Sequence, residues 1–199
     1  MTTLASIDRL NSFDIVLASK SPRRQHLLAE LGLQFRVIDH IDMEEVYPAS
    51  LRAEEIPLYL AKAKAACCER YLDPNTILIT ADTIVWLENE VIEKPYDHED
   101  AVKMLGKLSG RMHEVFTGVC IKTVAGESSF FASSRVWFRQ LSEEEIRYYV
   151  EKFSPLDKAG AYGVQEWIGY VGVERIEGSY FNVMGLPVQQ LYNELLKLI

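Results

Sequence analysis

The 199-residue sequence has few cysteines and no long apolar run. Cys67, Cys68 and Cys120 show no Cys-x-x-Cys spacing, and adjacent Cys67 and Cys68 are poor disulfide partners. We therefore expect buried thiols in a reducing cytoplasm. No apolar run approaches the roughly 18 residues of a membrane span, and residues 1–11 lack the features of a signal peptide. These absences predict a cytoplasmic protein without a membrane partner.

The sequence also has no surplus of basic residues. It contains 21 Lys+Arg against 29 Asp+Glu, which gives a net charge of -8. A protein that coats nucleic acid needs a basic surface, and anionic lipid repels an acidic protein, so neither partner is expected. A small anionic substrate stays compatible with this charge if a local basic pocket, a divalent cation or both offset the surrounding field.

Several familiar catalytic motifs are missing as well. The sequence has no G-x-x-x-x-G-K-[ST], G-x-G-x-x-G, H-E-x-x-H or G-x-S-x-G pattern. The four histidines do not have the spacing of metal ligands; they are His26, His40, His98 and His113. A histidine-based zinc site or a serine triad is therefore a poor hypothesis.

What is present is typical of a globular α/β protein, with 48% hydrophobic and 25% charged residues. At roughly 150 residues per domain, the length favours one domain, divided into two lobes at most. Helical and strand-like patterns alternate at first and long adjacent strands follow, which predicts a mixed sheet. The expected strands are 13–18, 35–38, 76–81, a hairpin over 84–92, two within 113–124 and 130–141, and 170–176. The expected helices are 22–31, 56–71, 97–108, 142–152 and 186–198.

Hydroxyls and cations gather between the first strand and the first helix. Ser21 is a good N-cap and Pro22 suits the first helical position. With Ser19, Arg23 and Arg24 beside it, this helix N-terminus is suited to bind phosphate, because unpaired N–H groups and arginine forks both bind phosphate oxygens. The alternative is a well-capped helix with solvated arginines.

A carboxylate follows the strand expected at 76–81. Ligands of open α/β sheets sit at the carboxyl ends of strands, and Asp82 is expected at that edge. There it could bind a divalent metal or take a proton from water. The alternative is an aspartate that starts a turn.

Two lysines and a glutamine are further candidates. Pro95 fixes an extended approach that could aim Lys94 at phosphate, and Lys64 shares the apolar face of its helix. The alternatives are a solvated Lys94 and a Lys64 that reaches outward to water. In the glycine-rich segment 157–165, the Gln165 amide suits the edge of a nucleobase, and the alternative is a plain strand connection.

Together these segments resemble the Maf family of nucleoside triphosphate pyrophosphatases. The order LASxSPRR, then ADT, then DKAGAYGxQ is very specific, and the match spans most of the chain. The matching segments are LASKSPRR at 17–24, ADTIV at 81–85, EKP at 93–95, LDKAGAYGVQ at 156–165 and GSYFNVMGLP at 178–187.

The resemblance implies a fold and a reaction. The expected fold is a single Maf-like domain over 1–199, with an elongated mixed β-sheet flanked by helices, similar to Maf and ITPase proteins, and two lobes around one substrate cleft. The expected reaction hydrolyses dTTP and UTP to the monophosphate and pyrophosphate, and modified pyrimidine nucleotides are an open further substrate class. The expected purpose is removal of surplus or non-standard nucleotides.

The resemblance also implies roles for single residues. Asp82 matches the general base, and the specificity positions match Arg23, Thr83 and Gln165. Mg²⁺ or Mn²⁺ is the implied cofactor, held by Asp82 and Glu44, with Asp42 and Glu45 competing for the place of Glu44. The chain departs from the family where Glu166 replaces the glycine that usually follows the glutamine. Further substrate-binding positions match Ser19, Ser21, Arg24, Lys64 and Lys94.

Other functions stay open from the sequence. The family name is linked to arrest of septum formation, so the chain could instead be a nucleotide-responsive regulator of cell division. The same hydrolysis could act on another base, as in 7-methyl-GTP or CTP. The nucleoside triphosphate is the expected partner, and a homodimer is an open alternative because the family often forms dimers.

Overall fold

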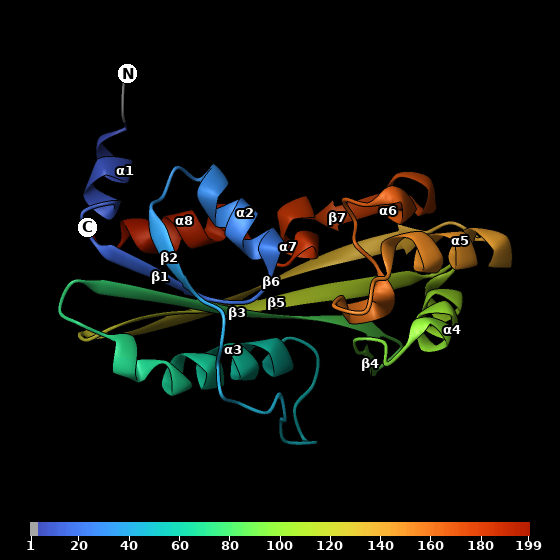
Figure 1. Ribbon diagram of the computed structural model, residues 1–199, viewed down its shortest axis with the longest axis horizontal. Helices are drawn as coiled ribbons and strands as arrows, with labels where there is room; N and C mark the ends of the chain where they lie inside the picture. The colour runs from blue at the N-terminus through green and yellow to red at the C-terminus, as the bar shows by residue number, and fades with distance from the viewer. Residues whose placement is uncertain (1–3) are drawn as a thin grey trace. The chain divides into compact units, whose positions relative to one another are not determined.

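The computed structural model describes residues 4–199, which form a sheet with helices on its faces (Figure 1). The strands are β1 (Asp14–Ala18), β2 (Phe35–Ile38), β3 (Thr76–Leu87), β4 (Glu90–Ile92), β5 (Met112–Thr123), β6 (Gly126–Phe138) and β7 (Val173–Gly178). The α-helices are α1 (Ala5–Leu10), α2 (Pro22–Glu30), α3 (Glu55–Cys67), α4 (His98–Leu108), α5 (Glu143–Phe153), α6 (Trp167–Gly172), α7 (Tyr180–Met184) and α8 (Val188–Leu196). Two 3₁₀ turns cover Glu69–Tyr71 and Ala159–Ala161. No helix within residues 4–199 is both long enough and apolar enough to cross a membrane.

Within residues 4–199, the strands form one seven-stranded sheet in the order β2-β1-β3-β5-β6-β7, with β4 paired to β3. Strand β1 pairs in parallel with both β2 and β3. The β3–β4 and β6–β7 pairs are antiparallel. The expected mixed α/β sheet is therefore confirmed.

The chain divides into two compact units. Unit 1 contains residues 4–82, 117–132 and 185–199, and unit 2 contains residues 83–116 and 133–184. The long strands β3, β5 and β6 each contribute residues to both units.

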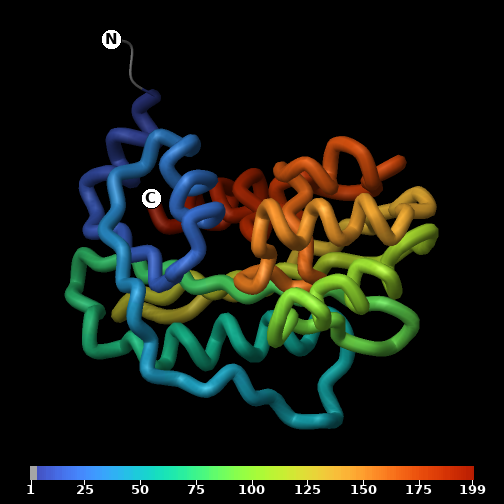
Figure 2. The backbone as a smooth tube through the Cα atoms, turned by 45° about the vertical axis from the view of Figure 1, so that its right-hand side comes forward, coloured from blue at the N-terminus to red at the C-terminus, as the bar shows by residue number. Residues whose placement is uncertain are grey.

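In unit 1, helix α3 packs against one face of the sheet (Figure 1). Its buried Ala61 and Ala65 belong to one apolar cluster with Val16 of β1 and Leu78 of β3. The opposite face of the strands is covered by α2 and α8 (Figure 1). Glycine is required at Gly118 of β5, because a Cβ there would lie 2.4 Å from the backbone of α3. From β2, residues 39–54 run as an irregular segment to the start of α3 (Figure 2).

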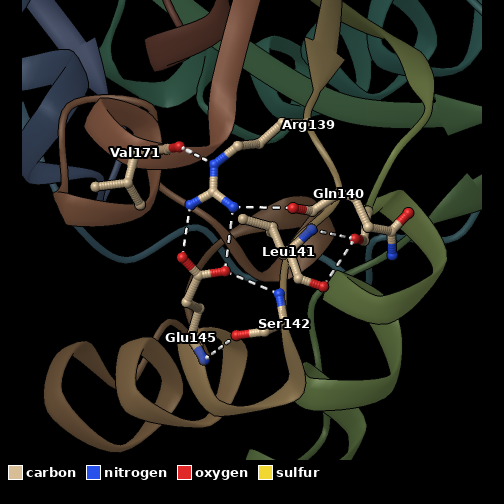
Figure 3. A network of polar contacts seen from close by, with 7 residues as sticks. Arg139, Gln140, Leu141, Ser142, Glu145 and Val171 are labelled. Carbon is tan, nitrogen blue, oxygen red and sulfur yellow. Dashed lines mark hydrogen bonds and ion pairs between the residues drawn. The ribbon is translucent and has the colours of Figure 1, made fainter.

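In unit 2, helices α4 and α5 pack together over an apolar core that includes Leu105, Val136 and the fully buried Tyr149. Helix α5 begins with the predicted capping box: Ser142 Oγ accepts from Glu145 N at 3.2 Å, and Glu145 Oε2 accepts from Ser142 N at 2.8 Å. The same carboxylate receives the guanidinium of Arg139 (Figure 3). This network joins the end of β6 to the start of α5.

Two predictions of secondary structure need correction. The strand expected to end at residue 81 continues through Asp82 to Leu87, because residues 85–87 pair with β4. The strand expected over 170–176 begins only at Val173, because residues 167–172 form α6. There Gly169 lies so close to Val164 O that an added Cβ would be 1.8 Å away, so the glycine permits a helical turn.

The remaining boundaries differ less. Helix α1 has no counterpart among the predicted elements, and the expected 56–71 helix ends at Cys67 and continues as a 3₁₀ turn. The expected 186–198 helix is shorter, and α7 precedes it. The predicted hairpin is confirmed, and its turn residues Glu88 and Asn89 have φ of +48° and +73°.

Candidate active site

The centre of the candidate site is an ion pair between β3 and α3. Thr80 and Asp82 are two residues apart in β3 and therefore face the same side of the sheet. Ala61 and Lys64 lie one turn apart on α3. Thr80 Oγ1 donates to Ala61 O at 2.7 Å, and Lys64 Nζ lies 2.5 Å from Asp82 Oδ1. Regular structure on both partners thus fixes the pair.

Burial makes this pair costly unless its charges are matched. Lys64 and Asp82 are 8% and 7% exposed. Glu45 Oε1 lies 2.7 Å from Lys64 Nζ, so one lysine holds two carboxylates. A buried charge is tolerated only when it is paired and hydrogen-bonded. Among the acidic residues that competed for one position in the sequence, the structure places Glu45 at Lys64, although Glu44 and Glu45 are both exposed.

Arg24 adds a positioned positive charge in the same unit. Its Nε donates to Gly185 O and its Nη1 donates to Ala81 O, both at 2.8 Å. Burial lowers the pKa of Arg24, neighbouring Asp82 opposes that shift, and Arg23 adds to it. The guanidinium stays charged, since arginine does not deprotonate in proteins. Two of its donors are therefore used to anchor the side chain beside Asp82.

The segment before α2 folds as the sequence predicts. Ser21 caps the helix, accepting from Arg24 N at 3.4 Å, and Pro22 occupies the first helical position. The buried Ser19 accepts from Ser21 N at 3.2 Å, and Arg23 is half-buried in the first turn. Because the parallel register of β1 on β3 ends with Ala18 opposite residue 80, Asp82 lies just beyond the carboxyl end of β1. Asp82 therefore lies at the carboxyl end of β1, as predicted for the sheet edge, although its own strand β3 continues beyond it.

The other predicted residues belong to unit 2. Thr83 is half-buried directly after Asp82 in β3, and Lys94 is exposed. The segment before Lys94 is joined to the glycine-rich loop, because Gly160 N donates to Glu93 O at 3.0 Å. Gln165 Oε1 is buried and accepts no hydrogen bond from any of residues 4–199.

The loop that carries Gln165 is tightly constrained. Gly160 has φ +69°, and a Cβ there would lie 2.9 Å from Val85, so only glycine fits. Ala161 has φ +57°, which is uncommon for a residue with a side chain. Such conformations persist only where the surroundings hold them.

Sequence reasoning assigned no role to a second charged cluster, in unit 2. Lys158, 7% exposed, donates to Asp157 Oδ1 at 2.7 Å and lies 3.2 Å from Glu166 Oε1. The hydroxyl of Tyr149 donates to Glu166 Oε2. Lys158 lies within the motif LDKAGAYGVQ, so the sequence marks it as a candidate. The contact between Glu166 and Tyr149 of α5 cannot be predicted from the sequence, because no spacing pattern links the two segments.

The residues present fit a hard divalent cation. Within residues 4–199, no group of three or more His, Cys, Asp or Glu side chains is arranged to hold a metal ion. Mg²⁺ usually takes only one or two protein carboxylates and completes its shell with water and substrate phosphates. Asp82 and Glu45, which converge on Lys64 Nζ, provide such a pair of carboxylates.

The fold and this cluster define a mixed α/β protein whose unit 1 combines a buried lysine and half-buried arginines with carboxylates beside a helix N-terminus. The chain belongs to the Maf family: the profile described as "Maf-like protein" matches residues 14–198. This confirms the resemblance inferred from the motifs.

Individual relatives agree with this membership. The dTTP/UTP pyrophosphatase of Phocaeicola vulgatus is 54% identical over 192 residues, covering 96% of this chain and 100% of the relative. The dTTP/UTP pyrophosphatase of Bacteroides fragilis (strain YCH46) is 53% identical over 195 residues, covering 98% and 100%. Among solved structures, the Staphylococcus aureus Ham1 protein aligns with 94% of this chain and 100% of its own at 17% identity and a TM-score of 0.49, which carries no functional argument.

Proposed function

We propose that this protein is a nucleoside triphosphate pyrophosphatase that hydrolyses dTTP and UTP to the monophosphate and pyrophosphate. Relatives of about half identical sequence carry that name. The observation in the structure that supports the proposal best is the buried Asp82–Lys64 pair with Arg24 anchored beside it. It provides a carboxylate for water and positive charge for phosphate in one place.

In the proposed reaction, water attacks the α-phosphorus. A new P–O bond forms while the bond from that phosphorus to the bridging oxygen breaks, and pyrophosphate leaves with the bonding electrons. Asp82 orients the water and accepts its proton. Lys64 holds the carboxylate at one oxygen, and the nearby positive charges of Arg23 and Arg24 stabilise charge developing on the phosphates. Lys94 is proposed as a further phosphate contact.

A divalent Mg²⁺ or Mn²⁺ is proposed as cofactor. Asp82 and Glu45 would hold it, in place of the predicted Asp82 and Glu44, because Glu45 is the carboxylate that shares Lys64 with Asp82. When bound, the ion would offset the charge of the triphosphate and polarise the phosphorus–oxygen bonds.

Base recognition is proposed for Thr83 and Gln165 of unit 2. The unpartnered Gln165 Oε1 is an acceptor that needs a donor. Uracil and thymine carry an N–H between two carbonyl groups, whereas cytosine has a bare nitrogen acceptor at that position. Gln165 would therefore favour UTP and dTTP over CTP. The small Thr83 leaves room for the ring.

Product analysis over a nucleotide panel tests the proposal. Purified protein is incubated with dTTP, UTP, CTP, GTP, 7-methyl-GTP, ATP and a modified UTP, with and without Mg²⁺ or Mn²⁺. We expect metal-dependent UMP and dTMP together with pyrophosphate. In Gln165→Ala, kcat/KM for UTP should fall about 10- to 100-fold more than that for GTP. Preference for another base would overturn the base assignment, and nucleotide binding without turnover would favour a regulatory function instead.

A further inference from the structure

We propose that Glu166 is a positioning residue for Gln165: its carboxylate ties the glycine-rich loop to α5 and so fixes the amide that recognises the base. This inference rests on the proposed function. It concerns the position where the chain departs from the family's usual glycine. Glu166 itself is not expected to touch the substrate.

Both oxygens of the Glu166 carboxylate are engaged. Oε2 accepts from the hydroxyl of the fully buried Tyr149, and Oε1 lies 3.2 Å from Lys158 Nζ. The Tyr149 hydroxyl in turn accepts from Gly163 N at 3.0 Å. The loop is therefore held near its start at Lys158, in its middle at Gly163 and at its end at Glu166.

These ties surround Gln165 on both sides in sequence. Gly163 stands two residues before it and Glu166 directly after it. No hydrogen bond from residues 4–199 reaches Gln165 Oε1, so the position of this oxygen depends on the backbone that carries the side chain and not on a polar partner of its own. The loop also contains the left-handed residues Gly160 and Ala161, and such a backbone needs support from its surroundings.

The charge of Glu166 matters as well as its shape. The Lys158 side chain is 9% exposed and has two carboxylate partners, Asp157 with a side chain 57% exposed and Glu166 with one 20% exposed. Asp157 is the nearer partner, but solvent screens that pair more than the pair with Glu166. An uncharged glutamine at this position would lose the ion pair with Lys158 while keeping the volume.

The loop is also built around the Glu166 side chain. A Cβ at Gly163 would lie 2.7 Å from Glu166 Cδ and 2.9 Å from Oε2. Because Gly163 lacks that atom, the carboxylate can lie directly under the loop and reach Tyr149. Space, charge and hydrogen bonding therefore assign the same role to Glu166.

Three variants test the inference. Glu166→Gln removes the charge, and Tyr149→Phe removes only the hydroxyl, which keeps the inference testable if one variant folds poorly. Glu145→Gln is the matched control in the same unit, because Glu145 is likewise bound by a cation, Arg139, at the start of α5 (Figure 3) but does not contact the loop. The double variant Glu166→Gln/Tyr149→Phe measures coupling between the two partners.

Steady-state kinetics with UTP and CTP provide the first measurement. For Glu166→Gln and Tyr149→Phe, we expect KM for UTP to rise about 10-fold with kcat within about twofold of wild type, and the UTP-to-CTP preference to fall about 10-fold. The double variant should lose no more than the worse single variant. Glu145→Gln should keep the wild-type preference even if its unfolding midpoint falls.

Amide hydrogen exchange provides a second measurement that needs no activity. We expect the Gly163 amide to exchange at least about 10-fold faster in both loop variants and at the wild-type rate in Glu145→Gln. Unchanged preference and exchange in Glu166→Gln would overturn the inference, and so would equal losses in the control. A wild-type protein that releases no pyrophosphate from UTP or dTTP would overturn the proposed function alone, because hydrogen exchange still decides whether Glu166 holds the loop.

Discussion

The two units each contain a lysine that is almost buried between two carboxylates. In unit 1, Lys64 lies between Asp82 and Glu45. In unit 2, Lys158 lies between Asp157 and Glu166. In both, one carboxylate side chain is sheltered, at 10% exposed for Asp82 and 20% for Glu166, and the other is exposed to a greater extent. The residue types and the burial are thus nearly the same.

The difference lies in what surrounds the sheltered carboxylate. Asp82 stands on a long strand, is contacted by Lys64 through Oδ1, and feels the charge of Arg24. Glu166 stands at the end of a loop, and both of its oxygens are bound, by Tyr149 and by Lys158. A buried lysine–carboxylate pair therefore does not by itself define a catalytic site. Rigid placement beside further positive charge favours chemistry, whereas full engagement of the carboxylate favours a structural tie.

The largest expected difference between the clusters comes from removing the sheltered charge. Asp82→Asn should lower kcat for UTP about 10³-fold, within the range of general-base catalysis. Its unfolding midpoint should stay close to that of wild type, since Lys64 keeps Glu45. Glu166→Gln, the equivalent change in unit 2, should leave kcat nearly intact. Rapid-quench measurement of pyrophosphate release compares them, and turnover within tenfold of wild type in Asp82→Asn would remove Asp82 from the base role.

Replacing each lysine separates stability from activity. Lys64→Met and Lys158→Met both leave a sheltered carboxylate without its cation, so each should lower the free energy of unfolding by about 3 kcal/mol. Only Lys64→Met should also lower kcat more than about 100-fold, because its carboxylate partner is the proposed base. Urea denaturation and kinetics below the unfolding range would be measured on both. Equal loss of kcat in the two variants would contradict the assignment of chemistry to unit 1.

The pH dependence of stability in acid should depend on a third buried titratable group, His113 of unit 2. His113 is 1% exposed, its Nε2 lies 2.8 Å from the Tyr162 hydroxyl, and burial lowers its pKa to about 3. The unfolded chain binds this proton at an ordinary pKa of about 6.5. Unfolding is therefore favoured as pH falls from about 6.5 to 3, by up to about 1.4 kcal/mol per pH unit.

The variant His113→Leu/Tyr162→Phe removes both hydrogen-bonding partners together, which avoids leaving one unpaired. Thermal unfolding between pH 6.5 and 4 should then depend less steeply on pH than in wild type. As a control, Glu145→Gln should change the profile only below about pH 4.5, because Arg139 and Ser142 lower the pKa of Glu145 to about 2 and its stabilisation is lost in that lower window. An unchanged profile in the double variant would contradict a neutral buried His113.

Sequence alone predicted most of the regular structure, including the starts of α2 and α5. Ser21, Pro22 and the Ser142–Glu145 box mark helix starts through local chemistry, and local chemistry can be seen in a sequence. Lys64 was singled out because it is a charged residue on an apolar helix face. Its partner could not be derived, because the contact joins α3 to β3 across the sheet.

What the sequence did not predict depends on contacts between distant segments. The contact between Asp82 and Lys64 joins β3 to α3, which no local pattern reveals. The contact of Glu45 with Lys64 depends on the path of an irregular segment. Glu166 could be noticed only as a departure from the family, and its role required the position of Tyr149 on α5.

The smallest expected effect comes from Gly163, and it tests whether the close approach of Gly163 to Glu166 is needed to hold Gln165. Gly163→Ala would place a methyl group 2.7 Å from Glu166 Cδ without changing any charge. The displaced carboxylate should lower the UTP-to-CTP preference about twofold to threefold, in the same direction as Glu166→Gln. The matched control is Gly106→Ala in α4, where an added Cβ meets nothing within 4 Å and the preference should not change.

In a Glu166→Gly background the added methyl at residue 163 has no carboxylate to displace, so Gly163→Ala should then have no further effect on preference. A loss of the same size in both backgrounds would mean that the methyl acts on some other part of the loop, and the tie through Glu166 would not explain how Gln165 is held.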